Sequence, residues 1–292
     1  MTAIRVGTDA PVATPADVAD DRPTFVIQPT RGFTRIDFAE LWHFRDLLYF
    51  LTWREISVRY KQTALGVAWA VIQPLATMLV FTVFLGRLAK MPSDGIPYPI
   101  FSYLGLLPWT YFANAVTRSG ASLVGNSNLL SKVYFPRLLI PMSGTLSALA
   151  DFAIAFCILI LLMLWYGITP AASAWVLLPL SVLMTFAAFG VGMFFAALNV
   201  RYRDVQHAIP FLMQIWMYAT PVVYPSSVVP GKWKLVFALN PLAGLIEAYR
   251  AAMLGRPIDW ASLGVSSVVI VATVAFGLWQ FRRLEREFAD IV

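Results

Sequence analysis

Long apolar blocks recur along this sequence, and they constrain its fold more than any other feature. A hydrocarbon core about 30 Å thick is crossed by a helix of roughly 20 apolar residues. The blocks are continuous and do not alternate, which predicts helices and argues against a β-barrel. In chain order they are Ala64–Leu85, Ile100–Val116, Leu138–Tyr166, Ala174–Leu198, Ala208–Tyr224, which is short and holds two prolines, and Leu263–Phe281. They predict an all-α integral membrane fold with six transmembrane helices.

Composition supports a membrane protein and argues against a soluble domain. Hydrophobic residues make up 59% of the chain and charged residues only 13%, against about 25% charged in a typical soluble domain. The net charge of +6 comes from short basic clusters between the apolar blocks, a distribution that fixes orientation in a membrane. We therefore expect membrane lipid as a partner and no nucleic acid.

Basic residues also predict which way the chain crosses the membrane. If both termini lie on one side of six spans, that side receives 16 of the 22 lysines and arginines. Cytoplasmic loops carry the basic excess, so both termini are predicted to be cytoplasmic. Residues 1–40 contain no signal peptide and are predicted to be a flexible tail, while residues 63–292 form the membrane domain.

Two stretches do not fit simple hairpins of spans. Residues 41–62 place apolar side chains on one helical face beside several arginines, with Glu55 interrupting, and predict an amphipathic interface helix at the cytoplasmic surface. Residues 225–262 are too apolar for an exterior loop and too interrupted to span, so they predict re-entrant half-helices before the last span. The apolar face of the interface helix comprises Phe44, Leu47, Leu48, Leu51 and Val58.

Several kinds of catalytic site are absent from the sequence. It contains no Gly-x-x-x-x-Gly-Lys-[Ser/Thr] phosphate-binding loop and no Gly-x-Ser-x-Gly elbow. Its two histidines, His43 and His207, and its one cysteine, Cys157, have no metal-binding spacing. We therefore expect no catalytic residue, no metal site and no cofactor in this chain.

One carboxylate, Asp151, lies well inside a predicted span. A charge at that depth is costly and indicates a functional role by default. It can carry a proton or contact substrate, or it can be a packing residue that hydrogen bonds to Ser143, Ser147 or a neighbouring span. The sequence leaves these interpretations open.

Aromatic residues are abundant at 14% of the chain. Tryptophan and tyrosine commonly anchor helices at the membrane interface, but aromatic faces also stack against sugar rings. Position in the sequence does not separate an anchor from the lining of a sugar path. The residues concerned are Trp69, Trp109, Tyr111, Phe112, Trp216, Tyr218 and Tyr224.

Two predicted cytoplasmic segments carry the remaining signal. Residues 199–207 are rich in charge, and residues 126–137 run from polar to basic before Pro136. The second segment is oddly apolar for a turn, so it lies on the membrane or docks another protein. Its apolar residues are Leu129, Leu130, Val133, Tyr134 and Phe135.

Five strings together resemble one family. They are RYKQTALGVAWAVIQPL at 59–75, SKVYFPRLLIP at 131–141, NVRYRDV at 199–205, TPVVYP at 220–225 and LNPLAGLIEAYR at 239–250. In this order and spacing they resemble the membrane subunit of ABC-type polysaccharide and polyol-phosphate exporters, which include O-antigen and teichoic-acid permeases. The resemblance covers about residues 41 to 288 and leaves out the tail.

This resemblance implies a machine with several parts. Two copies of the chain would pair around a channel, with two copies of a cytoplasmic ATP-binding subunit that holds ATP and Mg²⁺. The cargo would be a lipid-linked glycan, often on an undecaprenyl diphosphate carrier. Arg59 and Lys61 would be charge-assisted partners of the diphosphate, or else ordinary flanking charges of a membrane segment.

The resemblance also implies roles for two sets of residues. Closure of the ATP-binding subunits would push on coupling residues and open a path lined by the first, second and fifth spans. The coupling candidates are Asn128, Leu129, Lys132, Tyr134, Phe135, Arg137, Arg201, Arg203 and Asp204. The substrate-path candidates are Arg59, Lys61, Asp151 and the seven aromatic residues named above.

Two rival functions remain at this point. An ion-coupled flippase of lipid-linked glycans would use Asp151 as its coupling carboxylate. A membrane glycosyltransferase or acyltransferase would need catalytic acids or a histidine that face a cavity, and no such constellation is visible in the sequence.

Overall fold

The structure is a computed structural model that describes residues 38–61, 66–229, 237 and 239–285. In these ranges every regular element is a helix and none is a strand. This confirms the all-α prediction, which follows from the need of a lipid-embedded backbone to bond within its own segment. Nearly all of the predicted tail at residues 1–40 lies outside the described residues.

Among the described residues, four helical segments are long and apolar enough to cross a membrane. Each coincides with a predicted span and differs from it by a few residues at its ends. The four are Gly66–Leu88 (α3 Gly66–Phe81 continued by the π-helix η1 Thr82–Leu88), Leu139–Trp165 (α6), Ala172–Arg201 (η2 Ala172–Val176 continued by α7 Leu177–Arg201) and Trp260–Glu285 (α11).

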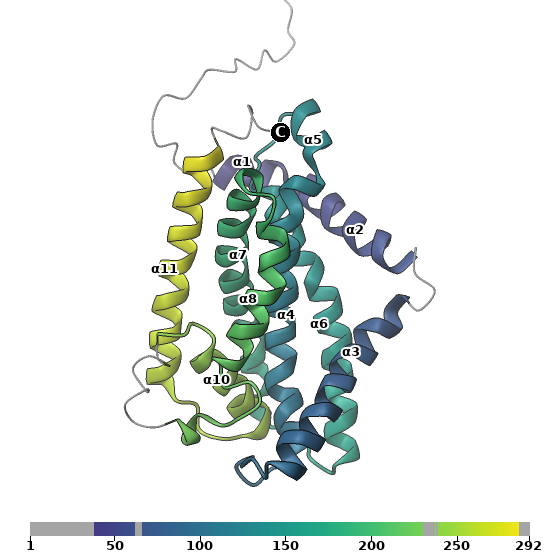
Figure 1. Cartoon of the computed structure of the whole chain (residues 1–292), viewed down its shortest axis with the longest axis vertical. Coiled ribbons are helices and arrows are strands. Elements are labelled where there is room, and N and C mark those ends of the chain that lie inside the picture. The colour runs from purple at the N-terminus through teal and green to yellow at the C-terminus, as the bar shows by residue number, and fades with distance from the viewer. Residues whose placement is uncertain (1–37, 62–65, 230–236, 238, 286–292) are drawn as a thin grey trace, which may run out of the picture. The chain divides into compact units, whose positions relative to one another are not determined.

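The central helix is α4, Tyr98–Gly125, which contains the predicted span Ile100–Val116. It packs against α3, α6, α7, α8 and α10, as Figure 1 shows. A helix surrounded by protein needs no continuous apolar surface toward lipid, and α4 accordingly buries Ser102, Ser119 and Ser122 beside its aromatic residues. It is not one of the four apolar segments, although it is longer than most of them.

The predicted span at 208–224 forms a shorter helix, α8, Val205–Tyr218. Its 14 residues rise about 21 Å, less than a hydrocarbon core of about 30 Å. The helix ends where the Thr220 side chain bonds back to the carbonyl of Trp216, just before Pro221, which cannot continue the ladder. The count of six spans therefore stays a prediction.

The region predicted to be re-entrant holds a short 3₁₀ turn, η3 Ser226–Val228, and a 12-residue helix, α10 Ala243–Leu254. Most side chains of α10 are buried, in contact with α4, α7 and α11. A short helix sheathed in protein is what a re-entrant half-helix requires. Residues 230–236 and 238 lie outside the described residues, so the pair of half-helices stays a prediction.

Two helices precede the first long one: α1 Phe38–His43 and α2 Arg45–Lys61. Phe44, Leu47, Leu48 and Leu51 pack against a buried apolar cluster of the chain itself, so the place of this helix at the membrane surface stays a prediction. The predicted face is wrong beyond that point, because Val58 is 51% exposed. Glu55 and Arg59 turn inward instead, toward polar partners on α6. The outward face of α2 carries Tyr49, Phe50, Trp53 and Val58.

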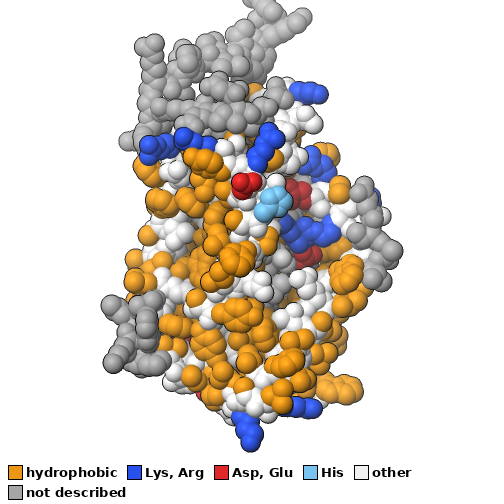
Figure 2. Space-filling model, in the orientation of Figure 1, with side chains coloured by type: hydrophobic (Ala, Val, Ile, Leu, Met, Phe, Trp, Pro, Cys, Tyr) orange, Lys and Arg blue, Asp and Glu red, His pale blue; other side chains and the backbone are white. Residues whose placement is uncertain are grey.

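Two helices approach one another backbone to backbone. A Cβ added at Gly277 on α11 would strike the carbonyl of Gly190 on α7, and one added at Gly190 would strike Val274. The two helices pack along each other extensively. In Figure 2 apolar side chains cover most of the helical surface, while charged side chains gather toward the end where the short helix α5, Ser127–Lys132, lies and at the opposite tip.

Candidate functional site

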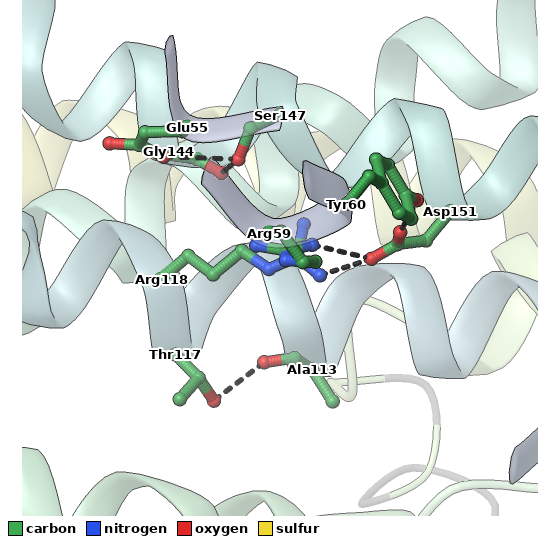
Figure 3. Close-up of polar contacts among 9 residues, drawn as sticks. All are labelled: Glu55, Arg59, Tyr60, Ala113, Thr117, Arg118, Gly144, Ser147 and Asp151. Atoms are coloured by element: carbon green, nitrogen blue, oxygen red, sulfur yellow. Dashed lines mark hydrogen bonds and ion pairs between the residues drawn. The ribbon is translucent and has the colours of Figure 1, made fainter. Parts of the chain in front are cut away.

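Asp151 on α6 is the centre of a charged cluster (Figure 3). The Arg59 guanidinium on α2 donates to its Oδ2 atom at 2.8 Å. Arg118 on α4 donates to the same oxygen, and the Tyr60 hydroxyl donates to Oδ1. The Asp151 side chain is only 17% exposed. Three elements therefore meet at one carboxylate, which accepts more than one charge-assisted hydrogen bond.

The contacts between α2 and α6 repeat with helical spacing. Ser147 donates to the carboxylate of Glu55 at 3.1 Å, one turn along both helices from the pair of Arg59 and Asp151. Residues four apart lie on the same face of a helix, so the two contacts form a polar ladder. Arg54 adds a bond to the side chain of Asn126 at the junction of α4 and α5.

The cluster has more positive charge than its carboxylate neutralises. Arg59 and Arg118 face one carboxylate, which leaves a net charge of about one positive unit if all three groups are ionised. The Nη1 atom of Arg118 is buried and has no hydrogen-bond partner among the described residues. An unpaired guanidinium N–H in a site of low dielectric favours a nearby anion.

Two groups on α2 titrate differently from free side chains. Burial raises the pKa of Glu55, and the hydrogen bond from Ser147 and the nearby arginines offset only part of that effect. Burial also raises the pKa of Tyr60, as do its hydrogen bond to Asp151 and the charge of that carboxylate. Tyr60 therefore stays a neutral hydrogen-bond donor in this cluster.

The structure separates the two basic residues predicted to meet a diphosphate. Arg59 lies inside the cluster and is bonded to Asp151. Lys61 is exposed at the last residue of α2, next to residues 62–65, which lie outside the described ranges. Ser143 and Ser147, the predicted partners of Asp151, bond elsewhere: Ser143 to the carbonyl of Ile140 and Ser147 to Glu55.

The aromatic candidates divide into a packed group and an exposed group. Trp216 on α8 packs edge-on against Phe112 at 5.3 Å and Trp109 at 6.5 Å between ring centroids. Tyr111 is buried, and its hydroxyl hydrogen bonds to that of Thr185 on α7 at 2.8 Å. Trp69 on α3 and Tyr218 on α8 are each 55% exposed. The Tyr224 hydroxyl donates to the carbonyl of Tyr218.

The apolar segment after α4 is mostly packed against its own chain. Phe135 is 5% exposed, and Leu129 and Leu130 pack against the same cluster. Val133 and Tyr134 remain 53% and 71% exposed. Asn128 and Lys132 are also exposed, while Arg137 donates to the backbone carbonyl of Glu285 at the end of α11. The surface open to a partner is therefore narrower than the sequence indicated.

The second coupling segment is the turn between α7 and α8. Arg201, Arg203 and Asp204 are exposed there. Behind them the Asn199 side chain, fully buried, donates to the carbonyl of Gly120 on α4 at 3.1 Å and accepts from the backbone N–H of Gln206 at 3.2 Å. This one amide joins the turn to the central helix, which continues toward α5.

Three residues of these sites were not predicted from the sequence. Arg118 and Tyr60 were each visible only as residues near a membrane boundary, and their partner on α6 is brought to them by packing. Asn199 had a faint signal, since an amide that opens a charged turn often bonds to backbone. No sequence pattern indicated that it would reach α4.

Comparisons with known proteins give one consistent picture. A family model described as ABC-2 type transporter matches residues 46–254. The chain is 32% identical over 262 residues to the O-antigen export system permease protein RfbA of Myxococcus xanthus, covering 87% of this chain and 98% of the relative. It is 29% identical to the RfbA permease of Klebsiella pneumoniae, covering 85% and 95%. It is 26% identical to the polysialic acid transport protein KpsM of Escherichia coli, covering 80% and 91%.

Proposed function

The chain belongs to the ABC-2 type transporter membrane family, and on that premise we propose that it is the transmembrane subunit of an exporter that carries polysaccharide across the bacterial inner membrane. One observation carries the proposal: the named polysaccharide and O-antigen export permeases align with this chain over 91% or more of their length. The long apolar helices agree with a multi-pass membrane protein.

We propose that a separate ATP-binding subunit supplies the energy for transport. Membership of the ABC-2 family implies an ATP-binding subunit, and we expect two copies of it beneath two copies of this chain, with both termini of the chain cytoplasmic. The exposed Tyr134 and Val133 and the turn at 201–204 form the proposed docking surface. Asn199 and Arg137 connect these surfaces to α4 and α11. A movement of the ATP-binding subunit at the docking surface would therefore be transmitted to the helical bundle.

The proposed cargo is a glycan linked to a lipid diphosphate. The cluster at Asp151 supports an anionic headgroup, because two arginines share one carboxylate and Arg118 has a free buried N–H. Charge-assisted bonds from arginine to phosphate oxygens are stronger than neutral ones. Lys61, exposed at the end of α2, would add a second contact.

The proposed path runs along α3, α4 and α8 between two copies of the chain. Apart from His207 in the first turn of α8, the exposed faces of α3 and α8 are apolar except for one glutamine each, Gln73 and Gln214. An amide that faces hydrocarbon costs several kcal/mol, on the order of 2–7, so these two side chains favour a wet or protein-lined surface. Trp69 and Tyr218 are exposed on the same two helices.

No contact among the described residues favours the ion-coupled alternative. Its carboxylate, Asp151, already accepts bonds from two arginines and a tyrosine. A proton carrier has to release and take up a proton without breaking the site, and protonation here would remove the negative charge that strengthens the bonds from both arginines.

The decisive experiment is purification followed by a transport assay. The tagged full-length chain should co-purify with an ATP-binding subunit from its own membranes, and vesicles that hold the complex should move glycan only while ATP is hydrolysed. If no such subunit associates with the chain, and glycan transport continues with a non-hydrolysable ATP analogue, the proposal is wrong.

A further inference from the structure

A cavity of about 220 Å³ lies at the end of the bundle opposite the Asp151 cluster. It is lined by the start of α4, the loop at residues 94–96, Pro225, α10 and the start of α11, and it is open on one side. From Phe101, which lines the cavity, to Arg118 the central helix rises about 25 Å. The two sites are therefore separated by most of a bilayer thickness.

One of the residues that line the cavity is a buried arginine, Arg250. Arg250 is 7% exposed, and it donates to the carbonyls of Pro221, at 2.8 Å, and Val222. Its guanidinium carbon lies 4.0 Å from the centroid of the Phe101 ring. The Nε atom is buried and has no partner among the described residues. The cavity wall thus includes an arginine whose guanidinium is held in place by two backbone carbonyls and an aromatic ring.

The walls supply acceptors and apolar surface. Glu247 lines the cavity one helical turn before Arg250, and Asp94 and Asp259 lie at the rim. Arg256 lies across the rim and donates to the carbonyl of Asp94 at 2.6 Å. The apolar part of the wall is formed by Ile96, Pro225 and Leu254. Donors, acceptors and apolar groups therefore converge within one small volume.

This composition selects a class of ligand. A simple anion would meet the carboxylates of Glu247, Asp94 and Asp259. No three His, Cys, Asp or Glu side chains in the described ranges are placed to hold a metal ion. A ring with several hydroxyl groups can hydrogen bond to side chains of either charge, since hydroxyls donate to carboxylates and accept from guanidinium groups. The C–H face of such a ring covers the apolar wall.

We propose that this cavity binds one sugar unit of the transported polysaccharide. The inference rests on the proposed function. If both termini are cytoplasmic, as proposed above, the cavity lies at the end of the path from which the polysaccharide leaves. Its volume is below the roughly 300–1,000 Å³ of sites for drug-sized ligands, which fits a single ring and not an oligosaccharide.

The test uses the full-length chain in lipid nanodiscs and saturation-transfer NMR. The probes are D-mannose, D-galactose, L-rhamnose and N-acetyl-D-glucosamine, with inorganic phosphate and spermidine as charged comparisons. At least one sugar should bind, and Glu247→Gln should weaken that binding about tenfold, because a hydrogen bond to a charged group is lost. Ala251→Phe, which fills the cavity without changing a charge, should abolish binding.

Asp46→Asn provides a matched control, because Asp46 is an exposed carboxylate on α2, far from the cavity. It should leave sugar binding unchanged, and thermal unfolding of every variant should show that the fold survives. The proposal is overturned if no sugar binds, if only phosphate or spermidine binds, or if sugar binding is insensitive to both cavity variants. Should ATP-dependent glycan export persist in any of these cases, the proposed function stands and the sugar site alone is wrong.

Discussion

Arg59 on α2 donates a 2.8 Å hydrogen bond to Asp151 on α6, 92 positions later in the chain. The contact joins a helix that precedes the first long apolar segment to the middle of a later one. Arg118 and Tyr60 bond to the same carboxylate, so α2 is held by partly buried polar groups at its C-terminal half and by leucines at its N-terminal half.

Removing the charge of Asp151 should destabilise the chain. Asp151→Asn leaves two arginines without their carboxylate, and we expect a loss of about 2–3 kcal/mol in the free energy of unfolding. The apparent unfolding midpoint of the purified chain in detergent measures it. Adding Arg118→Gln should recover part of the loss. An equal or larger loss in the double variant would contradict the pairing of Arg118 with Asp151.

Glu55 predicts a specific pH dependence of stability. Burial raises its pKa above the ordinary value of 4.5, so the folded chain binds this proton more tightly than the unfolded chain. The stabilisation is fully present below pH 4.5 and is lost as the pH rises through the raised pKa. Glu55→Gln should therefore unfold at a higher temperature than wild type at about pH 8. The unfolding temperatures of the two proteins should become equal at about pH 4.5.

Substitution by alanine should have different effects at the neighbouring residues Tyr134 and Phe135. Phe135→Ala removes a buried ring and should cost about 3 kcal/mol of stability, seen as a lower unfolding midpoint. Tyr134→Ala removes a ring that is 71% exposed and should leave the midpoint unchanged while it reduces the amount of co-purified ATP-binding subunit. If neither variant reduces the amount of co-purified subunit, the docking surface lies elsewhere.

A methyl group at Gly105 should disrupt the turn after α8. The added Cβ would overlap the carbonyl of Val222 and the guanidinium of Arg250, which hold that turn to α4. Gly105→Ala should therefore cost about 3 kcal/mol and reduce folded yield on size-exclusion chromatography. Gly264→Ala is the control, since nothing lies within 4 Å of a Cβ there. Equal yields from the two variants would argue against this packing.

The sequence predicted the long helices well because the requirement that makes them is local. The block at 138–166 differs by one residue at each end from α6, Leu139–Trp165, since length and apolarity alone set its limits. Asp151 was singled out for the same reason, as a charge within such a block. Its partners were not predicted, because Arg59 and Arg118 reach it only through the packing of three helices.

The cavity beside α10 shows the same limit of prediction. Arg250 and Glu247 lie in a string that resembled an exporter family, yet nothing in the sequence indicated that the arginine would be buried. Its place depends on two carbonyls in the turn at 221–222, and backbone acceptors carry no signal in the side-chain pattern. Val58 is a similar case. It is exposed because Glu55 and Arg59, and not Val58, face α6 in the second half of α2.

The backbone contact between Gly190 and Gly277 has a mechanical consequence. These two helices touch at their backbones and pack along each other extensively, so we expect α7 and α11 to move as one unit. This pair of helices carries Asn199 and the acceptor of Arg137 at one end, and the rim residue Asp259 directly precedes α11 at the other. We therefore expect a displacement applied at the first end to reach the second and to change the shape of the cavity there.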